Sequence, residues 1–126
     1  MAVLTIREAL RQALDEEMAR DEGVTEVLVW RGMAAGRIVI PISPYRKVKF
    51  CGIGEGLRTK VNASIGTSSD IVDIDMELEK VRQAELAGAD TIMELSTGGD
   101  FAEIRRRVCG ATKLSVGSVP LYQAFI

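Results

Sequence analysis

The chain has 126 residues, of which 47% are hydrophobic and 27% charged, and its net charge is −2. This composition is typical of one soluble globular domain rather than of a disordered or repeat chain. The small negative charge gives no positive field for nucleic acid, no apolar run reaches the ~18 residues of a membrane span, and the first residues do not resemble a secretory signal. We therefore expect a cytoplasmic protein that binds neither nucleic acid nor membrane.

Two helices are predicted at the start of the chain. Thr5 and Glu8 have the spacing of a capping box, and apolar residues then recur at steps of three and four until the helix ends near Gly23. A second helix is expected from Thr25 to Gly36, since glycine suits the left-handed position after a helix end. Within this helix, Trp30 is interpreted as a core residue rather than a ligand platform.

A change in organisation is predicted soon after the second helix. Two short strands are expected at residues 37–41 and 47–53, joined by a turn at residues 43–46. Residues 1–57 are therefore interpreted as an N-terminal α+β segment. From residue 58 onward strands alternate with helices, so residues 58–126 are expected to form an α/β segment of different construction.

Residues 58–126 predict three strands separated by two helices. Asp75 and Asp100 are the expected N-caps of the helices, which stop at Gly88 and Gly110, and Arg105–Arg107 are expected on a solvated helix face. The predicted strands are residues 59–65, 90–95 and 114–119. A parallel βαβαβ arrangement follows, either as half of a doubly wound sheet or as three strands of a barrel. The spacing of the elements is compatible with both.

Three residues recur at a spacing of 29, each near the end of a predicted strand: Ser64, Met93 and Tyr122. Because the carboxyl ends of parallel strands lie at the same edge of a sheet, we expect these side chains to share one rim, where α/β folds place their binding sites. Taken singly, Met93 and Tyr122 would be interpreted as core residues. Their equal spacing favours a ligand-binding rim.

The remaining chemistry is sparse, and no catalytic residue is assigned. The chain contains no histidine, and Cys51 and Cys109 lie too far apart for a metal knuckle, so buried free thiols are expected. The segment Ser96–Gly99 is either an anion site built from backbone N–H groups or a plain strand-to-helix turn. Asp90 and Glu94 are either a general base or solvated residues at the ends of a strand.

Several motifs occur in the order known from one enzyme family. They are GRIVIP, KVNASIGTS, ELEKV, AGADTIMELSTGGD, EIRR and VGSVPLYQA, which together span about residues 23–123. At these motifs the chain resembles the radical S-adenosylmethionine phosphomethylpyrimidine synthases of thiamine biosynthesis and their relatives, the hydroxybenzimidazole synthases. A separate stretch, LTIREALRQALDEEMARDE, resembles the opening helix of 2-oxo-acid dehydrogenase β subunits.

The resemblance to the synthases implies a (β/α)8 barrel and a lyase that converts aminoimidazole ribotide into another heterocycle. It also implies that Ser64, Met93 and Tyr122 contact the ribotide. The family has an asparagine in a NANIG pattern where this chain has Ser64, a shorter side chain with a different set of hydrogen-bond donors. The cofactors implied are a 4Fe-4S cluster, S-adenosylmethionine and a divalent metal such as zinc.

The chain departs from the family in the residues that hold these cofactors. The family has two histidine metal ligands and a C-terminal CxxCxxxxC motif, neither of which occurs here. We therefore expect no cofactor bound to this chain and no radical reaction from it alone. The function that we expect is that of a fragment or truncated relative of these synthases, inactive alone. The alternative is a non-catalytic binding or assembly scaffold, natural or an engineered composite. The open edge of the last strand and the apolar residues after it predict a homodimer or larger assembly.

Overall fold

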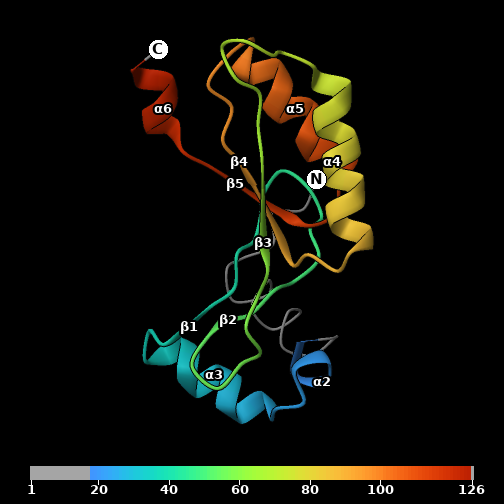
Figure 1. Ribbon diagram of the computed structural model, residues 1–126. Helices are drawn as coiled ribbons and strands as arrows, with labels where there is room; N and C mark the ends of the chain where they lie inside the picture. Colours follow the sequence, from blue (N-terminus) through green and yellow to red (C-terminus); the bar gives the residue numbers. More distant parts are fainter. Residues whose placement is uncertain (1–17, 126) are drawn as a thin grey trace. The chain divides into compact units, whose positions relative to one another are not determined.

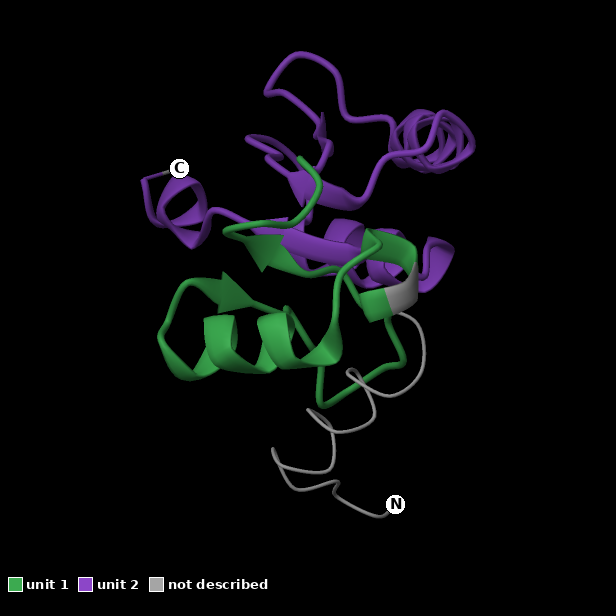
Figure 2. Cartoon of the chain, turned by 90° about the horizontal axis from the view of Figure 1, so that it is seen from below, with its two compact units in different colours: residues 1–59 green, residues 60–126 purple. Residues whose placement is uncertain are grey.

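The computed structural model describes residues 18–125, so the predicted capping box at Thr5 and Glu8 lies outside the described residues. The chain divides into two compact units, residues 1–59 and 60–126, which Figure 2 distinguishes by colour. The sequence places the change of organisation between residues 57 and 58. Figure 1 labels the helices and strands of both units.

The first unit combines short helices with a two-stranded sheet. Its elements are α2 (Met18–Glu22), α3 (Glu26–Ala34), β1 (Ile38–Val39) and β2 (Ile53–Gly54). The two strands are antiparallel, and Ile38 is the register partner of Gly54. Buried Val29 of α3 and Ile38 of β1 form a small core between the helix and the strands. The predicted α+β character of this segment is therefore confirmed.

The ends of α3 follow the prediction, but its buried face does not. The Thr25 hydroxyl accepts a hydrogen bond from the Leu28 N–H at 3.3 Å, and Gly36 has a φ of 68° after the helix end. The prediction for Trp30 is wrong, because that residue is 61% exposed. A Cβ at Gly32 would lie 2.5 Å from Ile38 Cδ1, so the missing side chain lets β1 pack on the Gly32 face and leaves the indole outside.

The second strand of this unit is shorter than predicted. Only Ile53 of the expected segment 47–53 belongs to β2, and the residues before it are not strand. The pairing is set by a close approach of the two backbones: a Cβ built on Gly54 would lie 2.1 Å from the Arg37 carbonyl oxygen. Because glycine alone fits there, the strands pair at Gly54 rather than along the more β-prone residues before it.

The second unit has the predicted βαβαβ order. Its elements are β3 (Asn62–Ile65), α4 (Ile74–Leu86), β4 (Thr91–Glu94), α5 (Phe101–Ala111), β5 (Ser115–Ser118) and α6 (Pro120–Ala124). The strands are parallel and lie in the order β3-β4-β5. The mixed α/β fold class is confirmed. The helix α6 is not predicted from the sequence, although Pro120 at its first position is a recognised helix-start signal.

Acidic caps begin both long helices of this unit. Asp100 accepts from the N–H groups of Ala102 and Glu103, both at 3.0 Å, as predicted. The predicted cap of α4 is wrong, because Asp73 and not Asp75 accepts from the Met76 N–H at 3.0 Å. Asp73 has the extended backbone that an N-cap needs, whereas Asp75 lies within the first turn of the helix and binds Arg107 instead.

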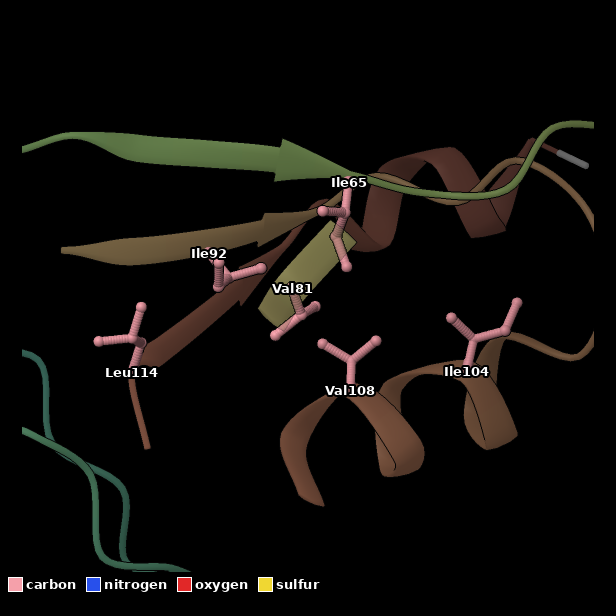
Figure 3. Close-up of a cluster of buried hydrophobic side chains, with 6 residues drawn as sticks. All are labelled: Ile65, Val81, Ile92, Ile104, Val108 and Leu114. Carbon is pink, nitrogen blue, oxygen red and sulfur yellow. The ribbon is translucent and has the colours of Figure 1, made fainter. Parts of the chain in front are cut away.

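The core of the second unit lies between the sheet and one layer of helices (Figure 3). Ile65 and Ile92 project from the strands toward Val81 of α4 and toward Ile104 and Val108 of α5. Ala63 and Val116 pack against the same cluster. In Figure 1, α4 and α5 cover the same side of the sheet. Since successive strand residues point to opposite faces, the other residues of each strand face away from this core.

The fixed spacing of 29 residues holds for only one strand pair. Ser64 is the register partner of Met93, which is 29 residues later, but the partner of Met93 on β5 is Gly117, which is 24 residues later. Tyr122 lies beyond the strand, in α6. The prediction of an equal repeat is therefore wrong for the third strand. The connection through α5 is shorter than the one through α4, because the loop before the helix, the helix itself and the turn after it are all shorter.

Ion pairs on the outer helix surfaces explain the shifts in pKa. Hydrogen bonds from Arg82 and Gln83 lower the pKa of Glu79 to about 2, and a hydrogen bond from Arg106 lowers the pKa of Glu103. Each of these exposed pairs lies within a single helix, and such pairs stabilise a fold little because water screens them.

No helix among the described residues is long and apolar enough to span a membrane.

Candidate functional site

The face of the β3-β4-β5 sheet opposite the helices carries small and polar residues. Two rows of register partners cross it: Asn62, Thr91 and Ser115 form one row, and Ser64, Met93 and Gly117 form the other. The Thr91 hydroxyl donates to the Asn62 side-chain oxygen at 2.9 Å, so the first row is internally hydrogen-bonded. An uncharged face of hydroxyl, amide and thioether groups can bind a polar, uncharged part of a small molecule.

Two of the three predicted site residues lie side by side. Ser64 and Met93 are register neighbours on β3 and β4, on the helix-free face, and Ser64 is exposed while Met93 is half-buried. Tyr122 is on α6, just after the carboxyl end of β5, and 44% of it is exposed. The structure thus brings Ser64 and Met93 together and places Tyr122 after the end of the strand next to them.

Gly117 is part of this face, although the sequence analysis did not identify it. A Cβ built on Gly117 would lie 3.2 Å from both Sδ and Cε of Met93, so the methionine side chain extends over the space that the glycine leaves open. Because these atoms are the flexible end of the Met93 side chain, the missing Cβ of Gly117 affects where the thioether lies but not the course of the backbone.

We expect the substitution Gly117→Ala to displace the Met93 thioether with little change in stability. The reason is that a methyl group at 3.2 Å is too close for the present Met93 rotamer, whereas the side chain can move. The measurement is the methyl resonance of Met93 in a chain labelled at methionine methyl groups. The Met76 methyl, on α4, is the internal control. An unchanged Met93 resonance would contradict the inferred contact.

Two loops are joined at the carboxyl end of the sheet. The Thr67 hydroxyl donates to the Gly98 carbonyl at 2.6 Å, the Thr67 N–H donates to the Ser96 hydroxyl at 3.1 Å, and the Thr97 N–H donates to the Thr67 carbonyl at 2.9 Å. Thr67 and Ser96 are buried. The loops after β3 and β4 therefore form one hydrogen-bonded layer. This layer lies at the carboxyl end of the strands that carry Ser64 and Met93.

The anion hypothesis for Ser96–Gly99 is not supported by these contacts. The Ser96 N–H donates to the Glu94 carboxylate at 2.6 Å, and the Thr97 N–H donates to the Thr67 carbonyl, so neither group is available to an anion. The start of α5 is already capped by the negatively charged Asp100. A carboxylate at that position repels a second anion, so the plain turn is the better interpretation.

The two carboxylates of β4 have structural contacts. Glu94 is 2% exposed and lies on the helix face, where it binds the Ser96 N–H and, at 3.3 Å, Arg105 Nε. It is therefore not a solvated end residue, and it does not face Ser64 and Met93. Asp90 accepts from the Val61 N–H at 2.8 Å, which joins the segments that precede the two strands.

Arg105 is a second residue whose surroundings the sequence analysis did not predict. It is half-buried rather than fully solvated, and Nη2 donates to the Gln123 side-chain oxygen of α6 at 2.6 Å. The helical period contains a signal for this, because Arg105 follows Phe101 by four residues and precedes Val108 by three, so it borders the buried stripe. Arg106 does lie on the solvated face, paired with Glu103.

The described residues do not fit an iron–sulfur cluster. Such clusters are held by several cysteine thiolates. The chain has two cysteines: Cys51 is buried in the first unit, and Cys109 is half-buried on α5 of the second. Within residues 18–125, no group of three or more histidine, cysteine or acidic side chains is placed to hold a metal ion.

Comparison with known proteins identifies the family. Residues 5–126 match the sequence model described as the Radical SAM ThiC family. The chain belongs to this family. The match begins at residue 5, so it includes most of the N-terminal stretch whose sequence was also compared with 2-oxo-acid dehydrogenase β subunits.

The similar proteins share a name and are much longer than this chain. The phosphomethylpyrimidine synthases of Methanoculleus marisnigri and Methanosphaerula palustris are 75% and 73% identical to it over 124 residues. Phosphomethylpyrimidine synthase 1 of Methanosarcina barkeri is 65% identical over the same length. Each alignment covers 96% of this chain but only 29% of the relative, so the chain spans less than a third of these family members.

Proposed function

We propose that the chain forms one side of the substrate site of a phosphomethylpyrimidine synthase, the radical lyase that converts aminoimidazole ribotide into the pyrimidine of thiamine. Family membership supports the reaction class, and the name of the similar proteins supports the product. The observation that supports the site most is the pairing of Ser64 with Met93 on the helix-free face. These two positions are where the family's ribotide contacts are expected.

A barrel would give this face its function. In a (β/α)8 barrel the helices lie outside, the opposite face of each strand points inward, and the active site is at the carboxyl ends of the strands. Within the second unit, α4 and α5 pack on one face of the β3-β4-β5 sheet, and the other face carries mostly small and polar residues. We therefore propose that these strands are three of the barrel's eight and that Ser64, Met93 and Tyr122 face its interior.

Each proposed contact suits a different part of a ribotide. The Ser64 hydroxyl can donate to and accept from a ribose hydroxyl or a ring nitrogen. The Met93 thioether offers a polarisable surface to the flat heterocycle, and the Tyr122 phenol combines an aromatic face with a hydrogen-bonding tip. These side chains bind and orient the ligand. The chemical groups that react are not assigned to this chain.

The cofactors of the reaction are proposed to be bound by residues outside this chain. The family name implies S-adenosylmethionine and an iron–sulfur cluster, and a divalent metal such as zinc is expected from the resemblance. The two separate cysteines described above do not fit the cluster. We therefore propose that the 126-residue chain binds substrate without cleaving S-adenosylmethionine by itself. The cytoplasm remains the proposed compartment.

Calorimetric titration of the purified chain with aminoimidazole ribotide tests this proposal. Saturable binding near one ligand per chain is the expected result, and adenosine monophosphate, which shares the ribose phosphate but not the imidazole, is the control. Heats that do not saturate at millimolar ribotide would contradict a working side of the site. Such a result would favour the alternative, in which the family's motifs maintain the fold without forming a ribotide site.

We also expect the chain to form a homodimer or larger assembly. β5 ends the described three-stranded sheet, so its outer edge presents backbone groups that another chain could pair with. Leu121 and Phe125 of the segment that follows are 60% and 83% exposed. Leu121→Lys should shift the assembly toward monomer in light scattering, whereas Leu86→Lys, at an exposed position of α4, should not. A monodisperse monomer of the unaltered chain at micromolar concentration would contradict the expectation.

A further inference from the structure

The helix that carries Tyr122, α6, has few stabilising interactions of its own. α6 is five residues long, none of its residues is buried, and Val119 at its start makes no side-chain capping bond. Helices this short are not stable by themselves in water. A side chain on α6 can contact a ligand with a defined geometry only if another part of the protein fixes the helix.

A chain of hydrogen bonds connects α6 to the buried end of β4. Glu94 is 2% exposed, and its carboxylate binds the Ser96 N–H with one oxygen and Arg105 Nε with the other. Nη2 of the same guanidinium donates to the Gln123 side-chain oxygen at 2.6 Å. A planar guanidinium that is held at one nitrogen presents its other nitrogens in fixed directions, so the buried carboxylate orients the bond to α6.

Gln123 is the direct neighbour of Tyr122 on this helix. Successive residues of an α-helix are turned by roughly 100° about its axis, since one turn takes 3.6 residues. Fixing Gln123 against Arg105 therefore fixes the direction in which the Tyr122 ring leaves the helix. Within residues 18–125, no other side-chain hydrogen bond or ion pair joins α6 to the remaining elements.

We propose that Arg105 and Gln123 are positioning residues: the chain from Glu94 through Arg105 to Gln123 holds α6 so that Tyr122 points into the ribotide site. The inference rests on the proposed function, because it gives Tyr122 a ligand to contact. It adds two residues that do not touch the ligand themselves. Arg105 acts on the ligand only through α6, and its ion pair with Glu94 fixes the orientation of its guanidinium.

The variant that tests this most cleanly is Gln123→Ala. This substitution removes the hydrogen bond between Arg105 and α6. It leaves the ion pair between Glu94 and Arg105 intact, so the fold should survive. Gln123→Glu keeps an acceptor oxygen opposite the guanidinium and should behave like the unaltered chain. Gln83→Ala is the matched control, because Gln83 also makes one exposed side-chain hydrogen bond, to Glu79 of its own helix.

The first readout does not depend on any ligand. In Gln123→Ala, hydrogen exchange of the Tyr122 and Phe125 amides, which close the turns of α6, should become about threefold or more faster, as expected for losing a hydrogen bond to a charged group. Amides of β4 should keep their rates. Unchanged exchange in α6 would overturn the inference, whatever the ligand does.

The second readout is the affinity for aminoimidazole ribotide. Gln123→Ala should weaken binding about threefold to tenfold, Gln123→Glu should restore it, and Gln123→Ala should have no further effect when Tyr122→Ala is already present. If Tyr122→Ala weakens binding but Gln123→Ala does not, the positioning role is wrong and the proposed function stands. If Tyr122→Ala has no effect, the proposed site is wrong, and the role of Arg105 and Gln123 in that site is overturned with it.

Discussion

Replacing Gly66 by alanine is expected to lower the free energy of unfolding by about 3 kcal/mol or more, because two separate penalties act at this position. Gly66 has a φ of 151°, which L-residues rarely adopt, and a Cβ there would lie 2.7 Å from the backbone atoms Leu95 C and Ser96 N. Since the neighbours are backbone, they cannot move without separating the loops after β3 and β4. Urea unfolding followed by circular dichroism measures the change.

Two other glycines separate these penalties. Gly88 also has a positive φ, 87°, but a Cβ there would have nothing within 4 Å, so Gly88→Ala should cost only about 1–2 kcal/mol of backbone strain. Gly110 lies inside α5 in open space, so Gly110→Ala should raise stability by up to about 1 kcal/mol. Equal losses for Gly66→Ala and Gly88→Ala would contradict the close approach of the two loops.

Replacing Tyr122 by alanine is expected to reduce the rise in melting temperature that aminoimidazole ribotide causes by about half or more. A ligand at 100 times its Kd stabilises the folded state by about 2.7 kcal/mol, and losing an aromatic contact together with a hydrogen bond should weaken binding tenfold or more. The melting temperature without ligand should change little, because 44% of Tyr122 is exposed. Thermal denaturation with and without ribotide is the measurement.

Tyr45 provides the matched control for this substitution. It is 91% exposed and belongs to the first unit, whereas the proposed contacts all come from the second, so Tyr45→Ala removes the same kind of side chain from outside the proposed set of contacts. The ligand-induced rise should remain complete in Tyr45→Ala. A full rise in Tyr122→Ala would show that the ribotide binds elsewhere, and would remove Tyr122 from the site.

Local signals in the sequence predicted the second unit well. Asp100 caps α5, and Ile104 and Val108 form its buried stripe, because cap chemistry and helical periodicity are properties of a few neighbouring residues. The parallel order of three strands also followed from the alternation of strands and helices. These features do not depend on contacts between distant parts of the chain.

The failures concern contacts that a local pattern does not contain. Trp30 is exposed because Gly32, two residues later, accepts Ile38 against the helix. β2 lies at Gly54 because the backbone of Arg37 approaches there, and no propensity of residues 47–52 reports that approach. In both places a glycine made the contact possible, and in both the sequence analysis interpreted the larger neighbours instead.

The candidate site was predicted in part, for reasons that its residues show. Ser64 and Met93 are register partners, as equal spacing implies. Equal spacing did not carry over to β5, where Gly117 occupies the corresponding position and Tyr122 lies on a helix. Gly117 has no individual signature, since its role arises from the Met93 thioether, which another strand brings to it. The helical period places Arg105 beside the buried stripe of α5, but it does not report the contact with Gln123, which lies on another helix.

Methyl NMR of the methionine-labelled chain during titration with aminoimidazole ribotide tests the central claim most directly. The Met93 methyl lies on the helix-free face of the second unit, whereas Met76 is on α4 and Met33 belongs to the first unit, which supplies none of the proposed contacts, so the molecule contains its own controls. We predict that the Met93 resonance shifts in a saturable manner while those of Met76 and Met33 stay in place. A saturable shift of Met76 or Met33 without one at Met93 would contradict the assignment of this face as the ribotide site.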